Sequence, residues 1–383
     1  ALAAGGTIIC TQYLGQKNHE MANKSARQAL FIITAISVFI VVLGLAFRAP
    51  LLSFIFGKVD ADVMENSMVY FFYTVLSYPF IALYDAGASI FRAQENTRGP
   101  MVISIISNVM NIVGNGILIW VFHMGVAGAA ISTLVSRIFC AVVVLYQLRK
   151  DRQPIVVRDY LKIRPDGKMI GRILALGIPS GIENSMFQLG KLAIQSTVST
   201  LGTTAIAAQA MTNMLEMLNG TAVIGVGIGL MTVVGQSLGA GRKDEAVYYM
   251  KKLMIFSEVF LIACCAVVYV LARPITMIGG MEAKSAEMCL EMMFWITIVK
   301  PIVWMFAFIP AYGMRAAGDV RFSMVTSCIT MWTFRLCLCV YLIRVCGMGP
   351  MAVWIGMFTD WSVRAIVFGL RFKSGKWMEH KVV

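Results

Sequence analysis

Long apolar segments alternate with short polar loops along the whole chain. A helix of about 20 apolar residues is long enough to cross the hydrocarbon core of a bilayer. The alternation therefore predicts an all-α polytopic membrane protein with about eleven spans. The expected spans cover residues 1–14, 27–47, 66–91, 100–122, 125–148, 173–201, 204–238, 253–272, 287–314, 322–343 and 349–371.

The composition agrees with this pattern. Of the 383 residues, 58% are hydrophobic and 14% are charged, whereas a soluble domain is about half apolar and roughly a quarter charged. These values exclude a soluble enzyme, a disordered protein and a disulfide scaffold. The nine cysteines and three histidines lack the spacing of a metal site, and no Ser/His/Asp or HExxH pattern is present. We therefore expect no metal site and no enzymatic activity.

The basic residues are distributed unevenly between the loops. The net charge of +13 would suggest nucleic-acid binding in a soluble protein. Here one alternate set of loops holds 23 of the 33 Lys and Arg residues, the opposite set holds five, and five lie within spans. Cytoplasmic loops of membrane proteins collect Lys and Arg. The sequence therefore places the linker 149–172 and the C-terminus in the cytoplasm, predicts a multi-pass protein of the cell membrane, and excludes a nucleic-acid partner.

Short motifs recur about 224 residues apart. TQYLGQKNHEMA, from Thr11, matches GQSLGAGRKDEA, from Gly235, and FRAQENTRGPMVIS, from Phe91, matches MRAAGDVRFSMVTS, from Met314. The repeat predicts two bundles of six helices that enter the membrane from the same side, as parallel repeats do, around a central cleft. Since the second copy begins near residue 171, we expect the first helix of the first copy to lie before the chain.

The repeat also predicts the domain organisation. Residues 1–148 are expected to form an N-terminal bundle of helices two to six, residues 149–172 a cytoplasmic linker, and residues 173–383 a C-terminal bundle of helices seven to twelve. Two bundles that flank a cleft are typical of a transporter. A channel would more naturally place one pore within repeated subunits.

Several of these motifs resemble the multidrug and toxic compound extrusion (MATE) family. They are the repeated Gln-x-x-Gly helix ends, the loops RAQENTRGPM and RAAGDVR, and the segments GVAGAA, GIPSGIENSMF and TAIAAQAM. The resemblance extends from the second helix onward. It implies a twelve-helix antiporter that exports small organic, often cationic, compounds by alternating access. Inward Na⁺ or H⁺ would drive it without a further cofactor, and we expect a monomer in the bilayer.

Two other functions are alternatives to a cation-coupled exporter. A flippase of a lipid-linked sugar has a related two-bundle fold and would favour a cationic cleft for pyrophosphate. An integral-membrane enzyme would require a nucleophile, a base or a metal, which the sequence does not supply.

Ionisable residues within spans are functional candidates because charge is costly in a bilayer. Glu183 follows Pro179, which should bend the seventh helix and free backbone carbonyls, so Glu183 is a candidate for binding H⁺, Na⁺ or a cationic compound. Members of the family often have a functional acid in this helix, which the match places near Phe187 and Gln188. Lys191 would either neutralise Glu183 or act as a built-in cation. The family's coupling acid in the first helix has no counterpart in the chain.

Three further candidates lie in other spans. Glu216 and Asn213 share one face of the eighth helix, where they would either line a cleft or form interhelical hydrogen bonds. Asp85, six residues after Pro79, would be a pocket acid or the partner of an embedded cation.

The last spans contain a cluster of opposite charges and a possible hinge. Asp360 and Arg364 are spaced i,i+4, which predicts an intrahelical ion pair that Arg335 can join. We interpret this cluster as structural, with a Na⁺ or H⁺ role as the alternative. Lys300 and Pro301 mark a second interrupted helix, so Pro301 is a hinge candidate together with Pro179.

Overall fold

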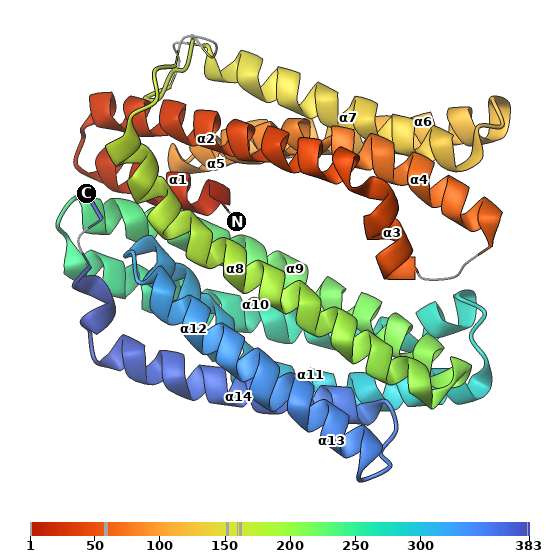
Figure 1. Cartoon of the computed structure of the whole chain (residues 1–383). Helices are drawn as coiled ribbons and strands as arrows, with labels where there is room; N and C mark the ends of the chain where they lie inside the picture. The colour runs from red at the N-terminus through yellow and green to blue at the C-terminus, as the bar shows by residue number, and fades with distance from the viewer. Residues whose placement is uncertain (1, 57–59, 151–152, 159, 161–162, 381) are drawn as a thin grey trace. The chain divides into compact units, whose positions relative to one another are not determined.

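The computed structural model describes the chain except for residues 1, 57–59, 151–152, 159, 161–162 and 381. The described residues form helices and no β-strand, as predicted (Figure 1). The chain divides into two compact units, Leu2–Gly177 and Ile178–Val383. The boundary falls inside helix α8 (Gly167–Val198), so the linker belongs to the N-terminal unit.

The helices of the N-terminal unit pack against one another, and a glycine allows α1 to lie close to α2. The unit contains α1 (Leu2–Gly15), α2 (His19–Ala46), α3 (Arg48–Phe56), α4 (Ala61–Leu76), α5 (Tyr78–Ala93), α6 (Arg98–Gly116), the π-helical turn η1 (Ile117–Val121) and α7 (Gly125–Leu148). Helix α1 packs on α2 and α5, and α7 packs on α4, α5 and α6. At Gly6, a Cβ atom would lie 2.7 Å from the Cβ of Ala29. Only glycine permits this approach of α1 to α2, a packing mode common among membrane helices.

The predicted span 66–91 consists of two helices rather than one. It breaks at Ser77, between α4 and α5, because Pro79 in the first turn of α5 has no N–H to bond to the preceding turn. The Ser77 hydroxyl donates to the Thr74 carbonyl at 2.6 Å. It accepts from Nη1 of Arg137 at 2.5 Å, so a side chain of α7 holds the break.

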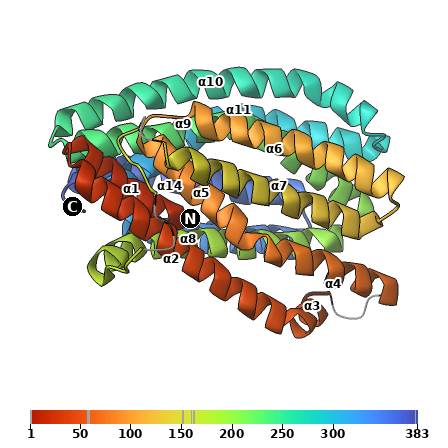
Figure 2. The same cartoon turned by 90° about the horizontal axis from the view of Figure 1, so that it is seen from above.

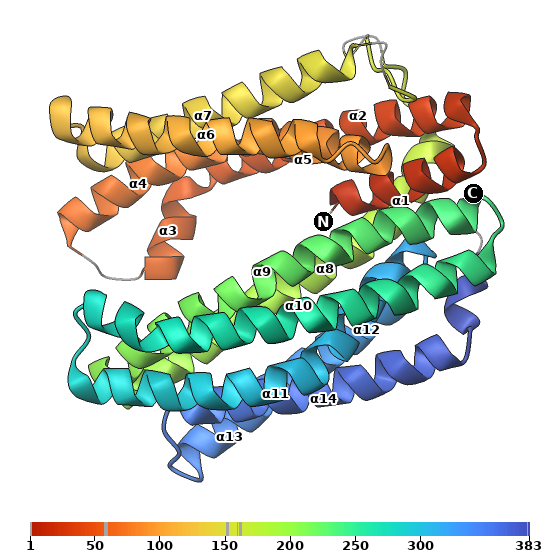
Figure 3. The ribbon, with the colours of Figure 1, turned by 180° about the vertical axis from the view of Figure 1, so that it is seen from behind.

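The C-terminal unit begins with Ile178, in the middle of α8. It continues with η3 (Ser199–Leu201), α9 (Thr203–Gly239), α10 (Lys243–Ile278), α11 (Ala283–Ala316), α12 (Val320–Thr330), the π-helical turn η4 (Met331–Cys337), α13 (Leu338–Arg344), α14 (Met351–Lys373) and η5 (Lys376–Met378). Helices α9, α10 and α11 lie side by side (Figures 2 and 3), and α14 packs on α11.

The order of elements repeats between the units, as the sequence predicts. Helices α1 and α9 end at Gly15 and Gly239, and α2 and α10 begin at His19 and Lys243; both pairs are 224 positions apart. A π-helical turn follows α6 in one unit and α12 in the other. The two units are therefore copies of one architecture.

Most of the predicted spans are helices that can cross a bilayer. In the described part of the chain, nine segments are long and apolar enough, and they are 19–46, 61–93, 98–121, 125–148, 203–239, 243–278, 283–316, 320–344 and 351–373. The chain is therefore a multi-pass membrane protein. Helix α1 has only 14 residues, and α8, although 32 residues long, is not among the nine because polar and charged side chains interrupt its apolar surface.

The linker is held against the N-terminal unit by amide side chains that bond to its backbone. Nδ2 of Asn23 donates to the Pro154 carbonyl at 3.2 Å, and Oδ1 of Asn23 accepts from the Val156 N–H at 2.7 Å. Gln28 forms the same kind of bridge between the Arg164 carbonyl and the Asp166 N–H, at 2.7 and 3.1 Å. These bonds replace the water that the extended backbone would otherwise bind.

Asp166 caps the N-terminus of α8, where the described extended part of the linker ends. Its carboxylate lies 2.5 Å from the Lys24 ammonium and also accepts from the N–H groups of Lys168 and Met169 at the start of α8. The hydrogen bond from Lys24, together with the bond from Met169, lowers the pKa of the Asp166 carboxyl below its ordinary value. A lowered carboxyl pKa stabilises the folded state above the ordinary pKa, and the effect is lost as the pH falls through the lowered value.

Asp166→Asn should loosen the docked linker, because the amide cannot form the ion pair with Lys24. We expect hydrogen exchange of the linker amides to accelerate roughly twofold to fivefold at neutral pH. Asp244→Asn, an exposed aspartate in the first turn of α10, is the matched control. Equal exchange in the two variants at neutral pH would contradict a role of this contact in linker docking.

Candidate functional site

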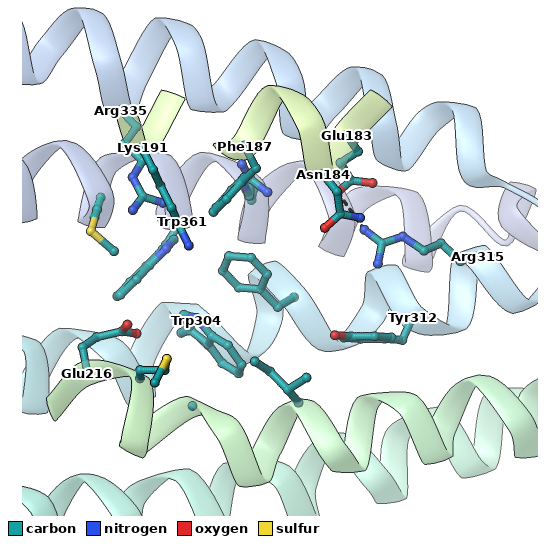
Figure 4. A pocket seen from close by; sticks show the side chains of 16 residues that line it. Glu183, Asn184, Phe187, Lys191, Glu216, Trp304, Tyr312, Arg315, Arg335 and Trp361 are labelled. Atoms are coloured by element: carbon teal, nitrogen blue, oxygen red, sulfur yellow. Dashed lines mark hydrogen bonds and ion pairs between the residues drawn. The ribbon is translucent and has the colours of Figure 1, made fainter. Parts of the chain in front are cut away.

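A cavity of about 320 Å³ lies inside the C-terminal unit, between α8, α9, α11, η4 and α14 (Figure 4). Its size is in the range of small-molecule sites. The sequence-predicted candidates among its lining residues are Glu183, Lys191, Glu216, Arg335 and Arg364. A second cavity, of about 560 Å³, shares Lys191, Glu216 and Arg335 and adds Gln188 and Asn213. Seven of the candidates therefore meet in two adjoining cavities.

Glu183 forms an ion pair across helices. Its Oε1 accepts from Nη2 of Arg315, in the last turn of α11, at 2.7 Å. The sequence offered Lys191 as the neutralising partner and counted Arg315 as a loop residue, so the partner is a different one. Oε2 of Glu183 is buried and has no hydrogen-bond partner among the described residues. The repeat could have indicated that Arg315 belongs to a helix rather than a loop. Arg92 and Arg315 occupy equivalent positions in the last turns of α5 and α11.

Glu216 forms a second interhelical ion pair, with Lys300 of α11. Nζ of Lys300 lies 2.5 Å from Oε1 of Glu216 and 3.1 Å from the Glu216 carbonyl oxygen. The Lys300 side chain is 0% exposed and the Glu216 side chain 21% exposed. The sequence identified Lys300 as an embedded cation next to Pro301 but did not predict this pairing. Ionisable side chains within spans commonly pair with one another, so Glu216 could have been sought as the partner of Lys300.

The third pair lies within α14. Nε of Arg364 donates to Oδ1 of Asp360 at 2.7 Å, the predicted i,i+4 geometry, and Nη2 of Arg364 donates to the Ser327 carbonyl at 3.0 Å. Arg335 does not bond to either residue. Its guanidinium lies over the Phe187 ring, 5.2 Å from the centroid.

Two amide side chains of α9, Gln209 and Asn213, line the second cavity and also take part in a contact with α14. Nε1 of Trp354 donates to Oε1 of Gln209 at 3.1 Å, and Nε2 of Gln209 donates to Oδ1 of Asn213 at 3.3 Å. Asn213 therefore takes part in an interhelical hydrogen-bond chain and also lines a cavity. The sequence presented these two roles as alternatives.

Asp85 lies in the N-terminal unit and lines none of the cavities described here. Its side chain on α5 is exposed and forms no hydrogen bond or ion pair with the described residues. The N-terminal unit has a separate cavity of about 260 Å³, lined by polar residues of α5, α6 and α7, including Tyr84, Asn111 and Arg137. This cavity was not predicted from the sequence, although Ser104, Asn108 and Asn111 recur at helical spacing.

The two hinge candidates lie inside continuous helices. Pro179 is within α8 and Pro301 within α11. Each lies within about one turn of an ion-paired residue, Glu183 and Lys300 respectively. A proline removes one backbone hydrogen bond from the helix, so these helices are weakest close to their charged residues. A hinge role at either position remains a prediction.

The cavities are surrounded by more basic than acidic side chains. Each of the three acids, Glu183, Glu216 and Asp360, has one basic partner. Lys191 and Arg335 line both cavities, and neither forms an ion pair with a described residue. The site as a whole is therefore positively charged.

The Glu216–Lys300 pair should show strong coupling in a double-mutant cycle. Glu216→Leu leaves a buried ammonium without its counter-charge and should lower the free energy of unfolding by about 3 kcal/mol. Lys300→Met should cost less, because the partly exposed Glu216 can bind water. The double variant should recover much of the lost free energy of unfolding, which is measured on the protein in detergent micelles.

Glu287→Leu, at an exposed glutamate of the same unit, serves as the matched control for the loss of a carboxylate. If the effects of Glu216→Leu and Lys300→Met simply add in the double variant, the pair does not act as a unit.

Comparison with known proteins extends these findings. The MatE family profile matches residues 1–117 and 179–341. A probable multidrug resistance protein, NorM of Thermotoga maritima, is 25% identical over 397 residues that cover 100% of this chain and 82% of that protein.

Solved structures share the fold over nearly the whole chain. An outward-facing multidrug resistance MATE family transporter of the MOP superfamily superposes with a TM-score of 0.89 at 18% identity, covering 98% of this chain and 84% of that one. A MOP superfamily transporter from Pyrococcus furiosus superposes with a TM-score of 0.90 at 17% identity, covering 99% and 84%. At this identity the likeness concerns the fold.

Proposed function

The chain belongs to the MatE family, and on this basis we propose that it is a secondary active transporter that exports organic compounds by antiport with Na⁺ or H⁺. Members of this family are transporters rather than enzymes. The observation that carries the proposal is the charged cavity of about 320 Å³ within a bundle of membrane-spanning helices. Charged side chains within membrane-spanning helices are energetically costly and are typical of transport pathways.

Glu183 is the proposed site of the coupling ion. Its free Oε2 offers a place for H⁺ or Na⁺, while Oε1 is bound to Arg315. Protonation or Na⁺ binding would weaken the pair with Arg315 and change the charge of the cavity. An ion that changes the affinity for cargo in this way drives exchange, since the coupling between two ligands is reciprocal.

Alternating access would require two states of the bundles, with different affinities for cargo and ion. Pro179 and Pro301 are the positions where α8 and α11 bend most easily. We place the protein in the plasma membrane as a monomer, with the linker and the C-terminus in the cytoplasm, in agreement with the basic residues of those segments. The preference for organic cations that the resemblance implies remains a prediction.

One observation favours a second candidate, a flippase of a lipid-linked sugar. Lys191 and Arg335 line the cavity and form no ion pair with any acid in the described part of the chain, and a pyrophosphate group would suit them. Movement of a fluorescent polyprenyl-pyrophosphate sugar across vesicle membranes that contain the protein, without movement of soluble dyes, would favour this function over export of organic compounds.

The test of the proposal is dye efflux from vesicles that contain the full chain. Vesicles are loaded with the xanthene dyes rhodamine 6G, a cation, and fluorescein, an anion, and a Na⁺ or H⁺ gradient is imposed. We expect one of the gradients to accelerate export of at least one dye. Glu183→Gln should abolish the acceleration, because the amide binds neither H⁺ nor Na⁺ as a carboxylate does.

Glu287→Gln removes an exposed carboxylate of the same unit and should leave the rate unchanged. Dye movement that ignores both gradients in the unaltered protein would reject ion-coupled antiport. A normal gradient response in Glu183→Gln would reject Glu183 as the coupling site and leave antiport in place.

A further inference from the structure

Three cations surround the Phe187 ring in the C-terminal unit. Nζ of Lys191 lies 5.5 Å from the ring centroid, and the guanidinium carbons of Arg335 and Arg364 lie 5.2 and 5.5 Å from it. They come from α8, η4 and α14, and all three line the cavity of about 320 Å³ (Figure 4). We call these three residues the cation cluster.

Only one member of the cation cluster is neutralised by an acid. Arg364 is paired with Asp360, whereas Lys191 and Arg335 form no ion pair or hydrogen bond through their charged groups with described residues. The two acids that line the cavity are also paired, Glu183 with Arg315 and Glu216 with Lys300. The cluster and its neighbours therefore carry two positive charges in excess.

Arg335 is the unusual member because it is buried. Its side chain is only 6% exposed, and its Nε has no hydrogen-bond partner among the described residues. A buried charge without a partner costs several kcal/mol, and the Phe187 ring compensates only part of that through a cation–π contact. A guanidinium kept in this state is ready to bind an anion, and its planar N–H groups suit an oxyanion.

The fold holds Arg335 in place on both sides. The residue lies in the π-helical turn η4, a distortion often found at functional sites. A Cβ atom at Gly356 of α14 would lie 2.8 Å from the Arg335 carbonyl oxygen, and a Cβ atom at Gly190 of α8 would overlap the Met331 side chain. The two glycines let α14 and α8 approach the turn closely, so the guanidinium does not depend on a flexible loop.

We propose that the cation cluster binds the anionic group of an amphiphilic cargo, a carboxylate, sulfonate or phosphate attached to an aromatic or apolar body. The anion would be bound by Arg335 and Lys191, and the body would lie against Trp304 and Trp361, which line the same cavity. This charge preference is opposite to the preference for organic cations that the family resemblance implies. The inference rests on the proposed transport function and names its class of cargo.

Paired dyes of one ring system test the charge preference. Binding of fluorescein and of rhodamine 6G to the purified full chain in detergent is measured by fluorescence anisotropy. We expect fluorescein to bind more tightly than rhodamine 6G. Arg335→Gln and Lys191→Gln should each weaken fluorescein binding about tenfold, the effect of losing one hydrogen bond to a charged group, and should leave rhodamine binding unchanged or stronger.

Control variants separate the site from general effects. Arg321→Gln removes an exposed arginine of the same unit and should not change fluorescein affinity. Arg335→Lys keeps the charge and should retain more affinity than Arg335→Gln. Since Arg335 forms no ion pair with a described residue, Arg335→Gln should not lower the unfolding temperature. If Arg335→Gln prevents folding, the variant Lys191→Gln, at an exposed residue, provides the test.

Two binding results would overturn the inference. One is rhodamine 6G binding as tightly as fluorescein in the unaltered protein. The other is fluorescein affinity in both Lys191→Gln and Arg335→Gln that stays within twofold of the Arg321→Gln control. Gradient-driven efflux that neither variant alters would also reject it while the transport function stands. Fluorescein binding that depends on Arg335, without efflux of either dye, would reject the transport function and keep the anion site.

Discussion

Burying a charged side chain within a bundle of membrane helices costs several kcal/mol unless an opposite charge and hydrogen bonds compensate it. The C-terminal unit meets this requirement for Glu183, Glu216 and Asp360, each of which touches one basic side chain at hydrogen-bond distance. Two of these pairs connect different helices, Glu183 of α8 with Arg315 of α11 and Glu216 of α9 with Lys300 of α11. Because α11 supplies both bases, its position relative to α8 and α9 is tied to the charge state of the cavity.

This arrangement links binding to conformation through simple electrostatics. A ligand that neutralises one member of an interhelical pair releases the other member, which must then find a new partner or become hydrated. Helices α8 and α11 both contain prolines close to these pairs. Each helix therefore lacks a backbone hydrogen bond, and bends most easily, close to the residue whose ion pair the ligand would break. The third pair lies within α14 and is bonded to the Ser327 carbonyl of α12. It can stay intact while the others exchange partners.

Arg335 is a buried cation that forms no ion pair with a described residue, and its surroundings explain how the fold accommodates this charge. The Phe187 ring replaces an acid as its neighbour, and the π-helical turn sets the position of the guanidinium beside the cavity. Glycines at the contacts of this turn with α8 and α14 remove the side chains that would push the turn away. Close packing and an unmet charge thus occur at the same point, which is more typical of a binding site than of a structural core.

Local properties of the sequence determined the helical class, the positions of most spans, the repeat, and the i,i+4 contact of Asp360 with Arg364, because hydropathy and helical spacing depend on neighbours in the chain. The break at Ser77 was within reach of the same reasoning, since Pro79 stands two residues later. Tertiary structure alone decided that Glu183 meets Arg315 rather than Lys191 and that Glu216 meets Lys300. It also decided that Arg335 forms no ion pair with the acids that the structure describes. These outcomes depend on how far each helix is rotated and shifted against its neighbours. Side-chain packing between residues more than 80 positions apart sets that geometry, and no periodicity within one helix encodes it.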